Sequence, residues 1–326
     1  MVKILLTHTP TMRANYYGDE ALAGLRSLGD VRLVEGDTPL TPQELVSVAQ
    51  DVDVVIADRL TTGPAQVFAN LPDLKAFLRC AVDIRNIDVE AASKAGVLVT
   101  RAKPGFVASV TELTLGFLVD LARGISRATA SYQANKLPQV RMGRQLAGST
   151  VGIIGFGSIG RNLADVAATL GMAVLISDPH ATVKDTRFRQ VELDTLLENS
   201  DHVVCLAVAV EETENLIDAR ALRLMKRDAV FINVSRGNLV DEQALADALR
   251  EGRIAGAAMD VGRAADQMPS PRLAALPNVL ATPHIGGLTP PAITAQALDT
   301  VEQVRELARG EVPHGAVNAE DWRRRL

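Results

Sequence analysis

Cysteine and long apolar runs are scarce in this chain of 326 residues. Its two cysteines, Cys80 and Cys205, lie in apolar, strand-like runs, which is typical of free buried thiols in a reducing compartment and argues against a disulfide. No run reaches the roughly 18 apolar residues that a membrane helix needs. The opening stretch MVKILLTHTP is interrupted too soon to be a signal peptide. We therefore expect a cytoplasmic protein with no membrane segment.

An excess of basic residues is also missing. The net charge is -5 and the pI is near 5.6, so the chain lacks the electrostatic footprint of a nucleic-acid-binding protein. The basic run Arg323 to Arg325 ends the chain and is interpreted as a solvated tail. Hydrophobic residues at 47% and charged residues at 22% are typical of globular proteins and argue against disorder. The length favours two domains over one.

Short apolar runs alternate with helix-like segments in two successive series, which predicts βα units on two parallel sheets. The first series is VKILLTH, VRLV, DVDVVIA, LKAFLRC and VLVT. The second is TVGIIGFG, MAVLISD, HVVCLAVAV, DAVFINVS and IAGAAMDV. A long amphipathic stretch over about 107 to 127 separates the two series, and a helical stretch over about 291 to 308 follows the second. This last stretch is free to return to the first domain.

The stretch VGIIGFGSIG places Gly155, Gly157 and Gly160 in GxGxxG spacing, after an apolar strand and before a helix-like segment. In this context the first glycine permits a tight turn, the second lets the backbone approach a pyrophosphate, and the third lets the helix pack on the strand. The helix N-terminus then supplies amide donors for the phosphates. The pattern predicts a dinucleotide site.

Asp178 ends the next strand, MAVLISD, eighteen residues after Gly160. A carboxylate there can accept hydrogen bonds from both ribose hydroxyls and would repel a 2'-phosphate, which favours NAD over NADP. The alternative is a turn residue before Pro179. His180, just beyond, is interpreted as a surface loop residue.

Arg236 and His284 are the candidate chemical groups. Arg236 follows the apolar run DAVFINVS, and His284 follows NVLATP, so both are expected at the carboxyl ends of strands, where ligands of open α/β folds bind. Guanidinium suits bidentate capture of a carboxylate, and imidazole titrates near neutrality. Taken alone, Arg236 could equally form a surface ion pair.

Three stretches, VGIIGFGSIG, INVSRGNLVDEQALADALREGRIAGAAMDV and LPNVLATPHIGG, resemble signature stretches of the D-isomer-specific 2-hydroxyacid dehydrogenases, in order and spacing. The resemblance covers most of residues 74 to 310. It implies two doubly wound parallel α/β domains. A Rossmann NAD-binding domain at 103–287 is inserted in a discontinuous flavodoxin-like substrate domain at 1–102 and 288–326.

The resemblance also implies roles for individual residues. Arg236 would bind the substrate carboxylate, and His284 would move a proton to or from the 2-oxygen while nicotinamide moves a hydride. Asp260 would contact the nicotinamide amide. NAD is the implied cofactor, and no metal site is expected. The further cofactor-binding positions that the resemblance implies are Ser158, Ile159, Val234, Ser235 and Gly286.

The stretch MDVGRAADQMP departs from the family pattern. The family has a glutamate five residues after the equivalent of Asp260, and it holds the histidine charged and oriented. Here that position is Ala265, followed by Asp266. Either Asp266 reaches His284 from one position later, or the site lacks its acid. A carboxylate beside His284 would raise the imidazole pKa and fix its tautomer, and we favour Asp266 as the partner.

Two substrate loops also depart from the family. In CAVDIRNID, Ala81 and Asp83 occupy usual glycine positions on either side of Val82, in a stretch whose backbone amides grip the substrate carboxylate in the family. In TRAKPGF, Arg101 and Lys103 replace an Asn and a Pro. We hypothesise that Arg101 or Lys103 recognises a second anionic group on the substrate; the alternative is a pair of solvated loop cations.

Two other functions stay open at this stage. The missing glutamate is consistent with an NAD sensor or corepressor that has lost turnover, although a pure sensor needs neither Arg236 nor His284. The altered loop at 80 to 88 leaves open an enzyme acting on formate or phosphonate. The resemblance further implies a homodimer, to which the stretch from Val107 to about Leu146 contributes.

Overall fold

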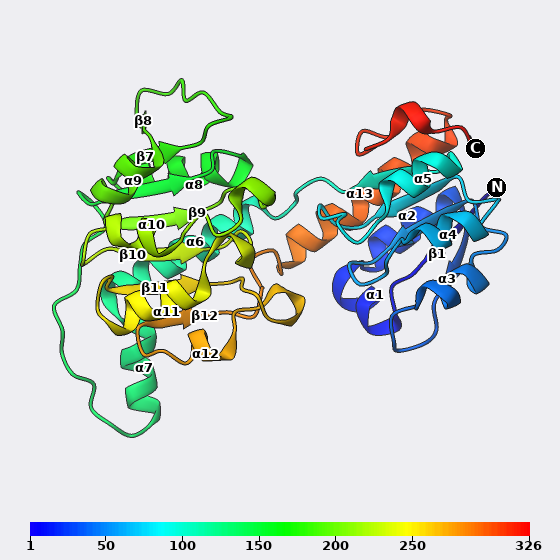
Figure 1. Ribbon diagram of the computed structural model, residues 1–326. Coiled ribbons are helices and arrows are strands. Elements are labelled where there is room, and N and C mark those ends of the chain that lie inside the picture. The colour runs from blue at the N-terminus through cyan, green and yellow to red at the C-terminus, as the bar shows by residue number, and fades with distance from the viewer. The chain divides into compact units, whose positions relative to one another are not determined.

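The computed structural model describes residues 1–326, which form two compact units (Figure 1). The first unit comprises Met1–Phe106 and Pro290–Leu326, and the second comprises Val107–Thr289. The boundaries expected at 102/103 and 287/288 fall a few residues earlier than these. Because the second unit is continuous and the first is not, the second is an insertion in the first.

The first unit contains five parallel strands in the order β2-β1-β3-β4-β5, the flavodoxin-like order of a doubly wound fold. Their bounds are β1 Val2–Leu6, β2 Gly29–Leu33, β3 Val54–Ala57, β4 Ala76–Arg79 and β5 Leu98–Arg101. Successive residues of a strand point to opposite faces, so Ile4 and Leu6 enter one buried cluster and Leu5 the other. A sheet buried on both faces explains why these strands read as continuous apolar runs.

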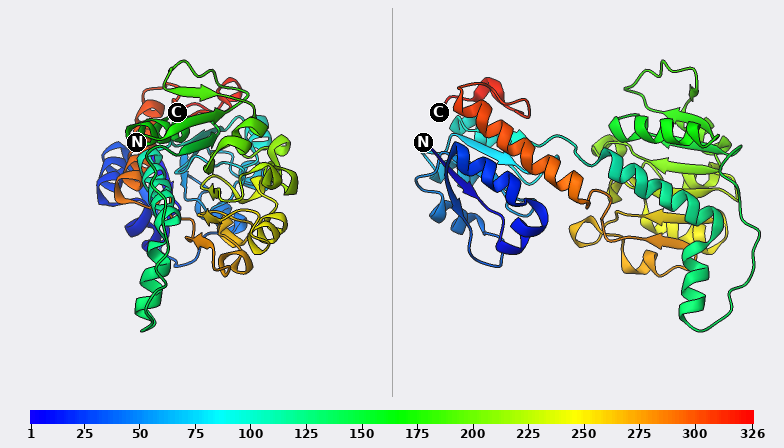
Figure 2. Two further views of the ribbon diagram at one scale, coloured as in Figure 1. Left: turned by 90° about the vertical axis from the view of Figure 1, so that its left-hand side faces the viewer. Right: turned by 180° about the vertical axis from the view of Figure 1, so that it is seen from behind.

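Helices cover both faces of this sheet. One face carries α1 Pro10–Tyr16, α2 Asp19–Leu28 and α13 Pro290–Ala308, and the other carries α3 Pro42–Val48, α4 Ala65–Asn70 and α5 Val89–Ala95. Both α1 and α3 begin at a Thr-Pro pair whose threonine accepts from a first-turn amide. Helix α13 returns to the first unit and packs along α2 (Figure 2), as its sequence position allowed.

The second unit contains seven parallel strands in the order β12-β11-β10-β9-β6-β7-β8. Their bounds are β6 Thr150–Ile154, β7 Ala173–Ser177, β8 Phe188–Gln190, β9 His202–Cys205, β10 Val230–Asn233, β11 Gly256–Met259 and β12 Val279–Ala281. The chain winds outward from β6 in both directions, so the order reverses between β6 and β9. The predicted pair of doubly wound parallel sheets is therefore confirmed.

Helices also cover this second sheet on both faces. Helices α6 Val107–Arg123 and α8 Ser158–Thr169 pack together on one face. The opposite face carries α9 Leu193–Asn199, α10 Ala219–Leu224, α11 Glu242–Arg250 and α12 Pro271–Ala274. Short 3-10 turns lie at Glu211–Thr213, Gly237–Leu239, Ala265–Gln267 and, in the first unit, Ala319–Asp321.

Three details differ from, or add to, the sequence expectations. The amphipathic stretch expected over 107 to 127 is two helices, because Gly124 is left-handed, with φ 67°, between α6 and α7 Ile125–Gln133. Strand β8 was not predicted, since only Phe188 of its three residues is buried. Cys80 and Cys205 are free and buried, as expected. No helix has the length and apolar character to span a membrane.

Candidate active site

The glycine turn between β6 and α8 has the geometry that its spacing predicts. Gly155 adopts φ +99°, and a side chain there would collide with the carbonyl of Leu206. A Cβ on Gly160 would lie 2.2 Å from the carbonyl oxygen of Gly155, so only glycine lets the helix approach the turn this closely. Gly157 faces open space. A ligand can therefore approach the backbone at Gly157.

The first turn of α8 has donors to offer to such a ligand. Its N-cap is Gly157, and no side chain caps the amides there. The amides of Ser158 and Ile159 therefore belong to the unsatisfied group at the positive end of the helix dipole. This donor set fits the pyrophosphate of a dinucleotide.

A cavity of about 1090 Å³ lies beside this turn. Its walls come from the ends of β6, β7, β8 and β9, including Gly155, Asp178, Val191 and Ala207. This is where the strand order reverses, the position at which open α/β sheets bind ligands. The cavity and the uncapped helix thus form one site that fits NAD.

Asp178 lies in the wall of this cavity. Its carboxylate accepts from the amide of Phe156 at 2.7 Å and from the amide of His180 at 2.8 Å. These contacts hold the carboxylate at the end of β7, with lone pairs left for ribose hydroxyls. The guanidinium of Arg161 stacks on the ring of Phe156 at 4.4 Å, on the same turn. His180 is exposed and also lines the cavity.

The candidate catalytic residues follow three adjacent strands. In the sheet register, Asn233 of β10 lies beside Met259 of β11, and Met259 lies beside Ala281 of β12. Arg236, Asp260 and His284 follow these three positions within a few residues. The sheet therefore brings all three to one carboxyl edge.

Two turns at this edge are in close contact. A Cβ on Gly237 would lie 2.1 Å from the backbone of Gly262, so the turn that carries Arg236 packs directly on the loop that follows Asp260. The hydroxyl of Ser235 donates to the carbonyl of Ala207 at 2.7 Å, and Ala207 lines the nucleotide cavity. The buried Val234 completes this turn. The Arg236 turn therefore adjoins the cavity.

Asp260 anchors the loop that carries His284. It is 2% exposed, and its carboxylate accepts from the hydroxyl of Thr282 at 2.6 Å and from the amides of Ile285 and Gly286 at 2.8 Å each. The amide of His284 donates to the main-chain carbonyl of Asp260 at 3.0 Å. A carboxylate with three internal donors fixes the backbone on both sides of the histidine. This anchoring role was not predicted from the sequence.

His284 is oriented by a main-chain group. Its Nδ1 lies 3.0 Å from the carbonyl oxygen of Asp266. Asp266, Gln267 and His284 are left-handed, with φ of 54°, 57° and 55°. The contact between Asp266 and His284 is made by the backbone oxygen of this exposed residue, whereas the sequence predicts its carboxylate as the partner.

Two supporting residues of this edge were missed by sequence reasoning. Asn233, fully buried, accepts from the amide of Ser235 and donates to the carbonyl of Arg236, which shapes the arginine turn. The guanidinium of Arg263 contacts Glu214, Asn215 and the carbonyls of residues 238 and 240. Asn233 ends β10 and Arg263 lies in the loop after β11, and the sequence has no pattern that sets either apart from other polar residues.

The predicted substrate loops belong to the first unit and follow β4 and β5. Asp83 forms a two-pronged ion pair with Arg85, with contacts of 2.6 to 3.1 Å. The buried Arg79 donates to the main-chain carbonyls of Asp58, Arg59, Thr61 and Asp83. Ala81 and Val82 are half-buried between these contacts. Side chains thus shape this loop where the family has glycines.

A buried histidine lies at the same edge of the first sheet. Burial lowers the pKa of His8, which follows β1, to about 4, against an opposing attraction from Asp58. Its ring is therefore neutral at pH 7 and packs on Tyr17 at 5.0 Å. Arg101 is the last residue of β5, Lys103 lies two residues later, and both are exposed.

Comparison with known proteins agrees with these features. Residues 115–286 match the NAD binding domain of the D-isomer specific 2-hydroxyacid dehydrogenases. The chain belongs to this family, and its second unit contains the family's NAD-binding domain.

Individual relatives cover the chain more fully. A D-3-phosphoglycerate dehydrogenase of Methanocaldococcus jannaschii is 34% identical over 98% of the chain and 60% of the relative. An (S)-sulfolactate dehydrogenase of Chromohalobacter salexigens is 36% identical over 80% of the chain and 86% of the relative. The crystal structure of D-lactate dehydrogenase with NAD+ from Lactobacillus jensenii is 25% identical, with a TM-score of 0.82 over 97% of this chain and 99% of that one. The chain spans about 60% of the length of the first of these relatives.

Proposed function

We propose that this protein is an NAD-dependent oxidoreductase that transfers a hydride between nicotinamide and C2 of a 2-hydroxy or 2-oxo acid. The observation that carries the proposal is the oriented imidazole of His284, on the same sheet edge as Arg236 and a turn that adjoins the dinucleotide cavity. Reduction of a carbonyl needs a proton donor, an anchor for the acid and a hydride source. The first two are side chains of this edge, and the reduced cofactor NADH would supply the third when bound.

His284 is the proton-transfer residue in this proposal. Because a carbonyl oxygen only accepts, its contact with Nδ1 places a hydrogen on that nitrogen. Nε2 is then the atom that exchanges a proton with the 2-oxygen of the substrate. In reduction the imidazolium donates from Nε2, and in oxidation the neutral ring accepts there.

Arg236 is the residue that holds the substrate carboxylate. A planar guanidinium can bind a carboxylate through two parallel hydrogen bonds, which fixes the orientation of C2 as well as its charge. The turn that carries Arg236 is shaped by Asn233 and by contact with Gly262.

Several residues contribute to cofactor binding in this proposal. The amides of Ser158 and Ile159 at the start of α8 bind the pyrophosphate, and the carboxylate of Asp178 accepts from the adenosine ribose. A 2'-phosphate would meet the negative charge of Asp178, so NAD is preferred over NADP. Asp260 and Gly286 border the nicotinamide. Oδ2 of Asp260 accepts from the amide of Gly286 and retains a lone pair for the carboxamide.

The role of Asp266 is specified further by the contact with His284. We propose that Asp266 orients the imidazole through its carbonyl oxygen, which any residue at this position would supply. A neutral carbonyl fixes the tautomer as a carboxylate does, but it stabilises the imidazolium less. In this proposal the backbone carbonyl of Asp266 orients the histidine, as the side chain of the glutamate does in the family.

The substrate is proposed to be a 2-oxo acid with a second anionic group. Arg101 at the end of β5 and Lys103 just beyond it place two cations where the family has neutral residues. The relatives named for phosphoglycerate and sulfolactate act on acids with a phosphate or a sulfonate. The sensor alternative is not favoured, because the named relatives are dehydrogenases and the proton-transfer group is oriented for use.

Steady-state reduction followed at the NADH absorbance band tests the function. The panel contains pyruvate, 2-oxoglutarate and 3-phosphohydroxypyruvate, with formate and phosphite tested in the oxidative direction. We expect turnover with at least one 2-oxo acid, and a loss of kcat of about 100-fold or more for His284→Gln. Absence of turnover with every 2-oxo acid, with NADH still bound, would favour the sensor.

Asp266→Asn tests the role of the backbone carbonyl in the same assay. Because the carbonyl is kept, we expect the pH above which reduction declines to stay where it is in the wild type. A carboxylate partner would instead make this pH fall by about one unit or more in the variant. Such a fall would show that the carboxylate of Asp266, and not its backbone carbonyl, is the partner of His284.

The assembly and setting are proposed on separate grounds. We infer a homodimer in which a second copy covers α7 and the segment after it. Leu137, Val140 and Met142 are 89%, 97% and 99% exposed there.

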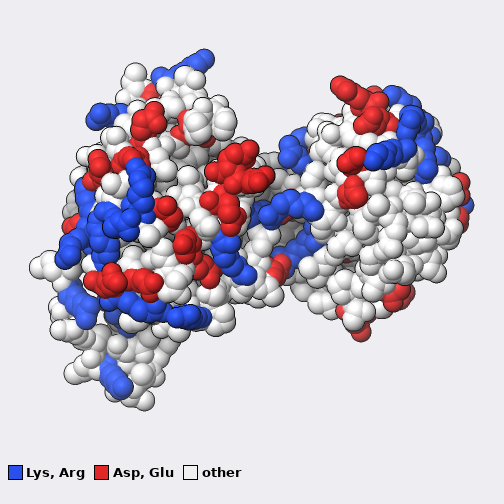
Figure 3. Space-filling model, viewed as in Figure 1, with Lys and Arg blue, Asp and Glu red and all other residues white.

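Two free buried thiols fit a reducing, cytoplasmic setting. Lys and Arg lie interspersed with Asp and Glu over the visible face of the second unit (Figure 3), which supports the absence of a nucleic-acid partner.

A further inference from the structure

The loop Arg101–Lys103 is held by its backbone on two sides. The amide of Arg101 donates to the carbonyl of Gly315 at 3.0 Å, and the amide of Ala102 donates to the carbonyl of Ala81 at 3.0 Å. The first contact ties the loop to the C-terminal segment, and the second ties it to the other substrate loop. All these groups belong to the first unit.

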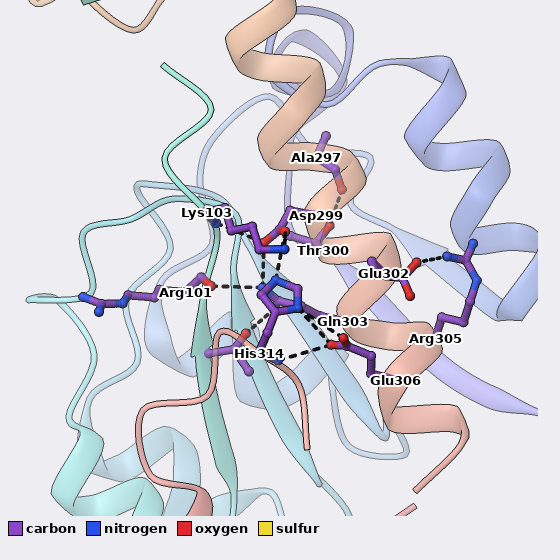
Figure 4. A network of polar contacts seen from close by, with 11 residues as sticks. Arg101, Lys103, Ala297, Asp299, Thr300, Glu302, Gln303, Arg305, Glu306 and His314 are labelled. Atoms are coloured by element: carbon purple, nitrogen blue, oxygen red, sulfur yellow. Dashed lines mark hydrogen bonds and ion pairs between the residues drawn. The ribbon is translucent and has the colours of Figure 1, made fainter. Parts of the chain in front are cut away.

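Side chains of α13 complete the attachment (Figure 4). Nε2 of Gln303 donates to the carbonyl of Arg101 at 3.0 Å and to Oδ2 of Asp299 at 2.9 Å. The same oxygen of Asp299 accepts from the amide of Lys103 at 3.0 Å. Gln303 is fully buried, and its Oε1 accepts from the hydroxyl of Thr100. Two backbone groups of the loop, the carbonyl of Arg101 and the amide of Lys103, are therefore fixed by residues about 200 positions later in the chain.

Asp299 is the centre of this arrangement and carries a nearly buried charge. Its side chain is 8% exposed, and burial of an unpaired carboxylate is costly. Nε2 of His314 lies 2.9 Å from Oδ1, and Nζ of Lys103 lies 3.7 Å from the same atom. Nδ1 of His314 lies 3.1 and 3.2 Å from the two oxygens of Glu306. The two ring nitrogens of His314 thus face both carboxylates and link the Asp299 side chain to Glu306.

The two loop cations differ in what they face. Lys103 directs its ammonium towards Asp299. The side chain of Arg101 points away from Asp299 and His314 in Figure 4, and its guanidinium makes no hydrogen bond or ion pair within the first unit. The ammonium of Lys103 thus pairs with the carboxylate of Asp299, while Arg101 is held only through its backbone.

We propose that Asp299, Gln303 and His314 are positioning residues that fix the backbone of Arg101, so that Arg101, and not Lys103, binds the second anionic group of the substrate. The inference rests on the proposed 2-oxo acid reductase function and specifies which cation selects the substrate. It also assigns Lys103 a supporting role, as a counter-charge for Asp299.

Kinetics of single and double variants test the proposal. We expect Arg101→Gln to raise KM about tenfold for 3-phosphohydroxypyruvate or 2-oxoglutarate, because it removes a charge-assisted hydrogen bond, and to leave KM for pyruvate unchanged. Lys103→Gln should change these values by less than about threefold. Asp299→Asn should raise KM for the dianionic substrate with kcat for pyruvate and KM for NADH unchanged.

The double variant Arg101→Gln/Asp299→Asn separates positioning from general destabilisation. If Asp299 acts through Arg101, the second substitution adds nothing to the KM of the first. Equal effects of Asp299→Asn with and without Arg101, or a larger effect of Lys103→Gln than of Arg101→Gln, would overturn the proposal. Glu302→Gln is the matched control, because Glu302 lies on α13 and pairs with Arg305 outside the network.

Amide hydrogen exchange gives a readout that does not need turnover. In the full-length protein, Asp299→Asn and His314→Ala should accelerate exchange in the peptide spanning residues 100 to 106 by about tenfold, and Glu302→Gln should not. Unchanged exchange in all three variants contradicts the positioning role even if the protein reduces 2-oxo acids. Faster exchange in a protein that turns over no 2-oxo acid would support the positioning role of Asp299 and His314 and would contradict the proposed reductase function.

Discussion

At the scale of single residues, the candidate site concentrates backbone strain. Asp266, Gln267 and His284 are all left-handed, although none is glycine. Each such residue costs about 1 kcal/mol or more, and strain of this kind persists where surrounding contacts determine it. The surrounding contacts here are the Asp260 carboxylate on one loop and the Arg263 guanidinium on the other. The strained loop places the carbonyl of Asp266 at Nδ1 of His284, whereas the alanine at position 265 has no side-chain acceptor to offer.

His202 is a buried residue that makes the stability of the folded protein depend on pH. It lies on β9, is 1% exposed, and neither ring nitrogen has a hydrogen-bond partner in the chain. Burial lowers its pKa, with Asp201 opposing and Arg144 reinforcing the shift. The unfolded chain therefore binds a proton at His202 more readily than the folded one. Stability is full above the unfolded pKa, about 6.5, and declines as the pH falls below it.

Replacement of His202 tests this linkage. We expect His202→Leu to flatten the decline of unfolding free energy between pH 6.5 and 5 by up to about 1.4 kcal/mol per pH unit. The thermal unfolding midpoint, measured by calorimetry across this range, follows the change. His180→Gln, at an exposed histidine, should leave the slope unaltered. Parallel slopes for wild type and His202→Leu would contradict the argument.

At the scale of elements, the site depends on contacts between turns. The turn after β10 carries Arg236, and the loop after β11 carries the carbonyl that contacts His284. Gly237 and Gly262 let the two backbones touch. A side chain at either position would separate the two groups that we propose to bind the carboxylate and move the proton, Arg236 and His284.

Gly237→Ala tests this contact. Because the added Cβ would lie 2.1 Å from the backbone of Gly262, the two turns must separate. We expect a loss of about 2 kcal/mol or more of stability and a fall in kcat/KM of about 100-fold, with NADH affinity less affected. Gly36→Ala is the control, since a Cβ at Gly36 meets nothing within 4 Å. Wild-type kinetics in Gly237→Ala would show that the close contact is dispensable.

At the scale of the whole molecule, α7 and the segment after it lack an internal partner. Helix α7 buries none of its residues and extends beyond the layers of the second unit (Figures 1 and 2). Tyr132 is 63% exposed, and the apolar residues that follow are almost fully exposed. Apolar surface of this kind is typical of an interface, and a second copy is the partner that we propose.

Charge substitution in this segment tests the dimer. We expect the wild-type protein to show twice the chain mass of 34.8 kDa in light scattering after size exclusion, and Leu137→Asp/Met142→Asp to show the chain mass. Val208→Asp is the matched control, because Val208 is 75% exposed but lies at the nucleotide cavity. A wild-type protein of single-chain mass at micromolar concentration would contradict the proposal.

Much of this organisation could be predicted from local sequence. Apolar runs of four to eight residues predict buried parallel strands, and the glycine spacing before a helix predicts the dinucleotide turn. The break at Gly124 and the short strand β8 were missed, because each depends on one backbone angle or on pairing with a neighbour. Local patterns carry little information about such features.

The sequence by itself determined which residues occupy the site, because strand ends in a parallel sheet share one edge whatever the side chains do. Arg236 and His284 were expected there on that ground, and Asp260 was expected there from the family resemblance. Only the tertiary structure decided how they are held. The contact on His284 comes from a main-chain oxygen. The carbonyl of Arg101 is held by Gln303 and the amide of Lys103 by Asp299, each about 200 residues away. Backbone atoms are the same at every position, and long-range contacts follow from folding, so neither leaves a motif in the sequence.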